Sequence, residues 1–171
     1  MKKQLKALLL SAGFGTRLRP LTYTTPKCLV EINKQPLLHI WLDKLEELNF
    51  HSTLINTHYL SDKVYKSIEG WKNKNLRVYT TFEENLLGTA GTLVKNLEFF
   101  RDSRGLIIHA DNLTTDRLSN LLDAHENRPN GTLLTMLTFE TNNPSECGIV
   151  EIDENNILKN FHEKVENPPG N

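Results

Sequence analysis

The sequence predicts an α/β fold of the Rossmann-like kind, in which helices cover both faces of a mainly parallel sheet. Short apolar segments alternate along the chain with segments that carry apolar residues at helical spacing. Strands that alternate with helices in this way are typical of a parallel sheet buried between two helical layers. Such sheets bind ligands beyond the carboxyl ends of their strands.

The first part of the chain is expected to supply most of this sheet. Apolar strands are predicted at residues 6–10, 28–32, 53–57, 76–81 and 106–110. Pro36, after the turn at residues 33–35, suits the first position of a helix. The apolar face of that helix consists of Leu38, Trp41, Leu45 and Leu48. Ser61 or Asp62 can cap a second helix that runs to about residue 69, and residues 89–100 are expected to form a third.

The last part of the chain is expected to add a helix, a strand and a hairpin. Thr115 or Asp116 can cap the helix, which runs to about residue 127. The remaining segments are a turn at residues 129–131, a long strand at 132–139 and a hairpin of residues 148–152 and 157–163. Residues 166–171 are loop-forming, so we expect the single domain predicted over residues 1–171 to be incomplete at its C-terminus.

Composition excludes several classes of protein. The net charge of −1 gives no bulk attraction to nucleic acid or to an anionic membrane. The two cysteines, Cys28 and Cys147, are too few for a disulfide scaffold and fit a reducing cytoplasm. No segment approaches the roughly 20 apolar residues of a membrane helix, and the N-terminal apolar run is too short for a signal peptide. We therefore expect a cytoplasmic protein.

A glycine-containing segment follows the first predicted strand. Gly13 and Gly15 let backbone amides approach an anion, while Arg17 and Lys27 supply the charge that a polyphosphate needs. We interpret this segment as a triphosphate-binding loop. It is neither a dinucleotide fingerprint, because residue 18 is Leu, nor a Walker loop, because no Gly-Lys-Ser/Thr follows. The alternative is a tight strand-to-helix turn flanked by ordinary surface charges.

Asp111 directly follows the predicted strand at residues 106–110. Ser11 directly follows the strand at residues 6–10, so both residues are expected at the same edge of the sheet. A carboxylate at a strand end is either a helix cap or a ligand for a hard cation. Next to a triphosphate loop, ligation of Mg²⁺ is the better explanation.

The segment from Leu10 to Thr22, LSAGFGTRLRPLT, with Thr25-Pro26-Lys27, resembles the signature of sugar-1-phosphate nucleotidylyltransferases. Three later blocks agree in the same order, at residues 87–92, 109–112, and 147–151 with 161–164. The blocks look most like those of mannose-1-phosphate guanylyltransferases and their close bacterial relatives. The resemblance implies the nucleotide-diphospho-sugar transferase fold. Cys28 stands where proline is usual, and no residue here can be assigned to the family's second metal-binding aspartate.

The resemblance also implies a reaction and its residues. A sugar 1-phosphate oxygen would attack the α-phosphorus of a nucleoside triphosphate (NTP), pyrophosphate would leave, and Mg²⁺ would assist. The implied catalytic residues are Arg17, Lys27 and Asp111, with Asp111 also the metal ligand. The implied nucleotide-binding residues are Ser11, Ala12, Gly13, Gly15, Thr16, Arg17, Glu84, Gly88 and Thr89. The implied sugar-phosphate-binding residues are Asn112, Gly148, Glu163, Lys164 and Asn171.

Alternatives remain at several of these positions. Glu83 and Glu84 can equally be solvated charges, Thr89 can cap a helix, and Glu163 and Lys164 can be a solvated strand end. GTP and mannose 1-phosphate are the expected partners, and the family suggests a homo-oligomer. A uridylyl- or thymidylyltransferase acting on glucose 1-phosphate or an aminosugar 1-phosphate is the nearest rival. A non-catalytic regulatory subunit that binds nucleotide sugars is the rival of another class.

Overall fold

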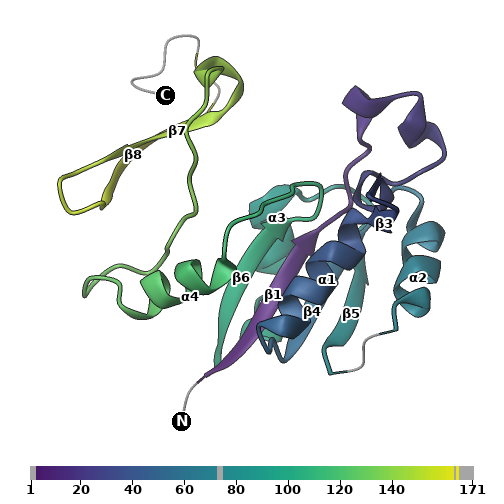
Figure 1. The fold of residues 1–171 in the computed structure, drawn as a ribbon, viewed down its shortest axis with the longest axis horizontal. Helices are drawn as coiled ribbons and strands as arrows, with labels where there is room; N and C mark the ends of the chain where they lie inside the picture. The colour runs from purple at the N-terminus through teal and green to yellow at the C-terminus, as the bar shows by residue number, and fades with distance from the viewer. Residues whose placement is uncertain (1–2, 73–74, 164, 166–171) are drawn as a thin grey trace. The chain divides into compact units, whose positions relative to one another are not determined.

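The computed structural model describes residues 3–72, 75–163 and 165 (Figure 1). The chain forms two compact units, Met1–Asp116 and Arg117–Asn171. Each unit has its own secondary structure. A single domain over residues 1–171 stays a prediction.

The first unit is built on a sheet of four parallel strands in the order β5-β4-β1-β6. The strands are β1 (Gln4–Leu10), β4 (Ser52–Thr57), β5 (Arg77–Phe82) and β6 (Ser103–His109). Strand β1 is central, and its Leu8 pairs with Leu54 of β4 and with Ile107 of β6. Four of the five strands predicted for this part of the chain are therefore confirmed, with shifts of a few residues at their ends.

Three helices connect these strands: α1 (Leu37–Glu47), α2 (Ser61–Gly70) and α3 (Gly88–Lys95). Parallel crossovers are right-handed, so α1 and α2 lie on one face of the sheet and α3 on the other (Figure 1). The chain runs outward through the sheet from β1 to β4 and β5, and then crosses back past β1 to form β6. The direction of the crossovers therefore changes between β1 and β6, which is where such sheets bind ligands.

The core of this unit lies between α1 and the central strands. The side chains of Ala7, Leu8 and Leu9 in β1 are completely buried, as are Leu38, Leu42 and Leu45 of α1. Burial of Leu37, Leu38, Trp41, Leu42 and Leu45 gives α1 one apolar face, as the helical spacing predicts. Burying such side chains fixes β1, and with it the point at which the glycine-containing segment begins.

The predicted strand at residues 28–32 is wrong. Residues Lys27–Leu29 form a short 3₁₀ turn, and within the predicted range only Glu31–Ile32 form a strand, β2. It pairs antiparallel with β3 (Gln35–Pro36) across Asn33 and Lys34, whose φ angles are 51° and 67°. Left-handed residues at both turn positions make a two-residue hairpin, which keeps these strands out of the main sheet.

Two helix ends also differ from prediction. Leu60, at a φ of 50°, precedes α2, and neither Ser61 nor Asp62 caps it. The helix predicted at residues 89–100 ends at Lys95, and Leu97–Phe100 is a 3₁₀ turn. The Asn96 side chain donates a hydrogen bond of 2.8 Å to the Thr92 carbonyl, which satisfies an acceptor of the last helical turn.

The second unit contains α4 (Leu118–Glu126) and a hairpin of β7 (Gly148–Ile152) and β8 (Leu158–Glu163). Helix α4 and the hairpin confirm the sequence prediction, but Thr115 and Asp116 do not cap α4, whose N-cap is Arg117. Residues 132–139 do not form the predicted strand: no described strand pairs with them, and Leu133 and Phe139 are 89% and 79% exposed. Apolar composition alone does not make a strand without a hydrogen-bonding partner.

In the described ranges, no helix combines the length and apolar character that crossing a bilayer requires.

Candidate active site

The glycine-containing segment leaves the carboxyl end of β1 as an open loop. Ser11 anchors its start, because its amide donates to Asn56 Oδ1 at 2.7 Å and its hydroxyl donates to the Asn56 carbonyl at 2.5 Å. No described residue accepts a hydrogen bond from the amides of residues 12–15. Unpaired amides on a loop at a strand end are donors for an anion. This arrangement agrees with the interpretation as a phosphate-binding loop.

Gly15 turns the loop into a short 3₁₀ helix, Thr16–Leu18, and it needs to be glycine. Its φ is 63°, and a methyl group there would lie 2.9 Å from Thr22 Cγ2 and 3.2 Å from Lys27 Cβ. Thr22 is 1% exposed, and its hydroxyl donates to the Gly15 carbonyl at 2.8 Å. The loop is thus held from behind by a buried side chain.

We expect Gly15→Ala to lower the free energy of unfolding by about 2 kcal/mol, from the left-handed backbone and the clash with Thr22. Chemical denaturation measures this change. Gly13→Ala is the control in the same loop, because an added methyl there meets nothing within 4 Å. Equal stability of the two variants would show that a side chain at position 15 causes no strain.

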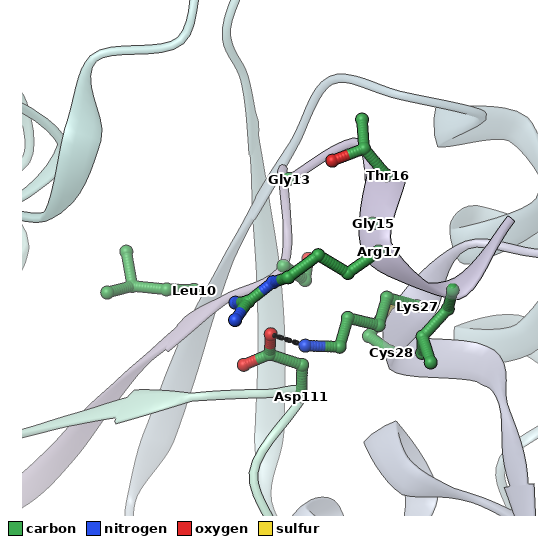
Figure 2. A pocket seen from close by; sticks show the side chains of 10 residues that line it. Leu10, Gly13, Gly15, Thr16, Arg17, Lys27, Cys28 and Asp111 are labelled. Carbon is green, nitrogen blue, oxygen red and sulfur yellow. Dashed lines mark hydrogen bonds and ion pairs between the residues drawn. The ribbon is translucent and has the colours of Figure 1, made fainter. Parts of the chain in front are cut away.

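Three charged side chains converge below this loop. Lys27 Nζ lies 2.5 Å from Asp111 Oδ2, and the two side chains are 27% and 32% exposed. Figure 2 shows the Arg17 guanidinium pointing toward the same carboxylate from the other side. Asp111 follows β6, and Trp41 of α1 fixes the next residue by donating to the Asn112 carbonyl at 2.8 Å. The sheet thereby brings together residues that are far apart in the sequence.

These side chains line one pocket of about 160 Å³ at the point between β1 and β6 where the crossovers change direction. Its lining residues are Leu10, Ser11, Gly13, Gly15, Thr16, Arg17, Leu18, Lys27, Cys28 and Asp111 (Figure 2). Sites that hold drug-sized ligands are roughly 300–1,000 Å³, so this pocket admits part of such a ligand. Its two cations and free amides select for an anionic part.

Cys28 adds no charge to the pocket. Burial raises the pKa of its thiol to about 12, so the group is neutral at physiological pH. A neutral buried thiol is a poor nucleophile. The chemistry of the site therefore depends on Arg17, Lys27 and Asp111.

A second polar cluster lies where β5 ends and α3 begins, and the sequence did not point to it. Glu83 is only 1% exposed, although a solvated charge was an expected alternative for it. Its Oε1 accepts from Thr92 Oγ1 at 2.5 Å and from Asn56 Nδ2 at 3.0 Å, and its Oε2 accepts from the Leu87 amide at 3.2 Å. Burial opposes ionisation, but these hydrogen bonds outweigh it and hold the pKa of Glu83 below its ordinary value.

The residues predicted to contact the base lie around this cluster and outside the pocket. Glu84 and Thr89 are exposed, and Gly88 begins α3 at a φ of 69°. Thr89 does not cap the helix, whose N-cap is Leu87. The amide side chain of Asn56, within the strand predicted at residues 53–57, was the sequence signal that could have revealed the Glu83 cluster.

The hairpin of the second unit brings two predicted sugar-binding residues together. Gly148 and Glu163 are directly opposite in the β7–β8 register. A methyl group on Gly148 would lie 3.1 Å from Glu163 Oε2 and 2.5 Å from Phe161 Cζ. Asn112, the third predicted residue in the described part of the chain, is exposed next to Asp111 in the first unit. Lys164 and Asn171 lie outside the described residues.

The family model described as Nucleotidyl transferase matches residues 6–171. The chain belongs to this nucleotidyl transferase family.

Its relatives within the family act on different sugar phosphates. A mannose-1-phosphate guanylyltransferase catalytic subunit beta from Drosophila melanogaster is 32% identical over 162 residues, which are 93% of this chain and 43% of the relative. A UTP–glucose-1-phosphate uridylyltransferase from Synechocystis sp. is 29% identical over 173 residues, which are 94% of this chain and 44% of the relative. The chain thus spans less than half the length of these relatives.

A solved structure confirms the predicted fold. HddC from Yersinia pseudotuberculosis, in complex with GMP-PN, superposes with a TM-score of 0.76 at 21% identity, over 93% of this chain and 69% of that one. The prediction of a nucleotide-diphospho-sugar transferase fold is therefore confirmed.

This nucleotidyl transferase pocket offers one carboxylate to a divalent cation. Asp111 is the acidic residue in its lining. Within residues 3–72, 75–163 and 165, no cluster of three or more His, Cys, Asp and Glu side chains could hold a metal ion. Mg²⁺ takes one or two carboxylates and completes its shell with phosphate oxygens and water. The donor set fits a magnesium ion bound together with a polyphosphate.

Proposed function

We propose that this chain carries the nucleotide-binding part of an enzyme that transfers a guanylyl group from GTP to mannose 1-phosphate. The observation that carries the proposal is the convergence of Arg17, Lys27 and Asp111 on one pocket beneath a loop with unpaired amides. Such a pocket neutralises the charge of a polyphosphate, which is what nucleotidyl transfer requires. The guanylyltransferase relative supports guanine and mannose.

Transfer needs no nucleophilic side chain, because the attacking group is already an anion. An oxygen of the sugar phosphate forms a bond to the α-phosphorus, and the bond from that phosphorus to the bridging oxygen breaks. The electron pair stays on the leaving pyrophosphate. The chain's task is to bring two anions together in line and to neutralise the charge that leaves.

The three pocket residues divide this task. The loop amides and Arg17 bind the β- and γ-phosphates, and Arg17 stabilises the departing pyrophosphate. Lys27 leaves Asp111 and lies between the α-phosphate and the sugar phosphate. Asp111 would hold Mg²⁺, which supplies further neutralisation of phosphate charge when bound. Glu84, Gly88 and Thr89 contact the base, and Gly148 and Glu163 bind the sugar.

A panel of NTPs and sugar 1-phosphates tests this proposal. Pyrophosphate release with Mg²⁺ is expected to be fastest with GTP and mannose 1-phosphate. Faster release with UTP or dTTP and glucose 1-phosphate would favour the rival that the Synechocystis relative represents. Tight binding of nucleotide sugar without pyrophosphate release for any pair would favour a regulatory subunit. A cytoplasmic location and a homo-oligomer stay predictions.

Gly148→Ala tests the sugar side separately. The added methyl must displace the Phe161 ring and crowd Glu163, so we expect the KM for mannose 1-phosphate to rise about tenfold with an unchanged KM for GTP. Steady-state kinetics with each substrate varied measures the effect. Gly70→Ala is the control, because its methyl meets nothing within 4 Å. A larger change in the KM for GTP would contradict the assignment of this hairpin to the sugar.

A further inference from the structure

The buried carboxylate of Glu83 is unusual because nothing in the proposed transfer uses it. Taking an ionised carboxylate out of water is unfavourable unless hydrogen bonds replace its hydration. Three donors do so here, from Asn56, Thr92 and Leu87, at 2.5–3.2 Å. Both oxygens are thereby engaged inside the protein. Glu83 is therefore not free to bind a ligand, in contrast to the exposed Glu84.

The partners of Glu83 connect two loops that are distant in the sequence. Asn56 donates from Nδ2 to Glu83, and its Oδ1 accepts from the Ser11 amide at 2.7 Å. Ser11 is the first residue of the phosphate-binding loop, and Leu87 precedes Gly88 at the start of α3. A continuous chain of hydrogen bonds thus runs from the Ser11 amide through Asn56 and Glu83 to the Leu87 amide.

We propose that Asn56 and Glu83 form a buried bridge that holds the phosphate-binding loop and the start of α3 in a fixed relation, and thereby raises the affinity for the NTP. The proposal rests on the proposed function, in which these loops contact the phosphates and the base of one nucleotide. Glu83 and Asn56 are positioning residues, because they act through Ser11 and Leu87. Loops ordered before binding lose less conformational entropy when the ligand binds, which favours affinity.

The donor and acceptor pattern of the bridge allows a sharp test. A glutamine at position 83 has one acceptor oxygen and one donor nitrogen, so in Glu83→Gln the nitrogen faces a donor at either Asn56 or Leu87. Turning over the Asn56 amide only moves the conflict to the Ser11 amide. The double variant Asn56→Asp/Glu83→Gln removes this contact between two donors. The aspartate accepts from both Ser11 and the glutamine nitrogen, while the glutamine oxygen accepts from Leu87.

Two measurements on the full chain follow these variants. Hydrogen exchange of the Ser11 and Leu87 amides reports the bridge in the free protein, and calorimetry with GTP and Mg²⁺ reports the affinity. For Glu83→Gln we expect exchange of both amides to accelerate and the Kd for GTP to rise, each about tenfold, from the loss of a buried hydrogen bond to a charged group. The double variant is expected to restore both quantities. The control is Glu69→Gln, the same chemical change on the exposed surface of α2.

The outcomes separate the bridge from a general effect on stability. If Glu83→Gln only lowers the melting temperature and its folded fraction binds GTP like the wild type, the proposal is overturned. Failure of the double variant to restore exchange and affinity overturns it as well. If Glu83→Gln does not fold, Thr92→Val removes one donor from the same oxygen and is expected to shift both quantities in the same direction by a smaller factor.

The exchange measurement also distinguishes this proposal from the proposed function. If the wild type binds no NTP, the proposed function fails, and so does the claim about affinity. Slow exchange at Ser11 and Leu87 that Glu83→Gln accelerates and the double variant restores would still establish the bridge. Unchanged exchange in Glu83→Gln would show that no bridge exists, whatever the nucleotide affinity.

Discussion

Lys27→Met is expected to lower the rate of pyrophosphate release about 10³-fold, while the protein stays folded. Methionine keeps an unbranched apolar stem, one heavy atom shorter than lysine, and removes the charge. Lys27 is the cation that pairs with Asp111 at 2.5 Å in the pocket. Loss of one preorganised group that stabilises charge in the transition state typically costs about 10²–10³ in rate. We expect the upper end, because two phosphates approach each other at this position.

The matched control is Lys66→Met, the same change at an exposed position of α2. Single-turnover kinetics at saturating GTP and mannose 1-phosphate separates loss of chemistry from loss of binding. A Lys27→Met rate within a few-fold of the control would contradict the role of the ammonium group between the two phosphates.

Asp111→Asn is expected to have the second largest effect on turnover. Its effect on the site is expected to be unfavourable when Mg²⁺ is present and favourable for NTP binding when Mg²⁺ is absent. With Mg²⁺ present, we expect turnover to fall about 10²-fold and half-saturation to need more magnesium, because the charged ligand is lost. Without Mg²⁺, we expect NTP to bind more tightly than to the wild type. The carboxylate repels phosphate, and it also holds Lys27 at 2.5 Å, so its neutralisation favours the anion.

Magnesium titrations of turnover and calorimetry in EDTA measure the two effects. Asp62→Asn on the surface of α2 controls for a general change in charge. An unchanged magnesium titration in Asp111→Asn would refute ligation by this carboxylate. Weaker binding without magnesium would show that Asp111 acts by holding the structure of the pocket.

The sequence pattern predicted the central sheet because those strands are defined by local apolar character. Residues 7–9 and 53–57 are buried without a break, and they pair side by side in β1 and β4. The strand prediction at residues 28–32 was wrong because the left-handed φ angles of Asn33 and Lys34 fold the end of this segment into a local hairpin. The strand prediction at residues 132–139 was wrong because a strand also needs a neighbouring strand to hydrogen-bond with, and apolar composition does not supply one.

The candidate site also contains residues that the sequence predicted and one group that it missed. Arg17, Lys27 and Asp111 were predicted to meet because each follows a strand end or the loop attached to it, and the pocket brings them together. Glu83 was missed because its burial depends on Asn56 and Thr92, which come from a different strand and from a helix. From the sequence alone a glutamate is expected to be exposed. Only the tertiary contacts show that the Glu83 carboxylate is buried and hydrogen-bonded inside the protein.

Calorimetric titration with GMP, GDP and GTP, in the presence and absence of Mg²⁺, tests the central claim most directly. If Arg17, Lys27 and the loop amides bind one polyphosphate, affinity should rise with each added phosphate, by about 100-fold or more from GMP to GTP. That gain should largely disappear in Arg17→Ala and Lys27→Met. Equal affinity for the three nucleotides, or an undiminished gain in both variants, would contradict the account.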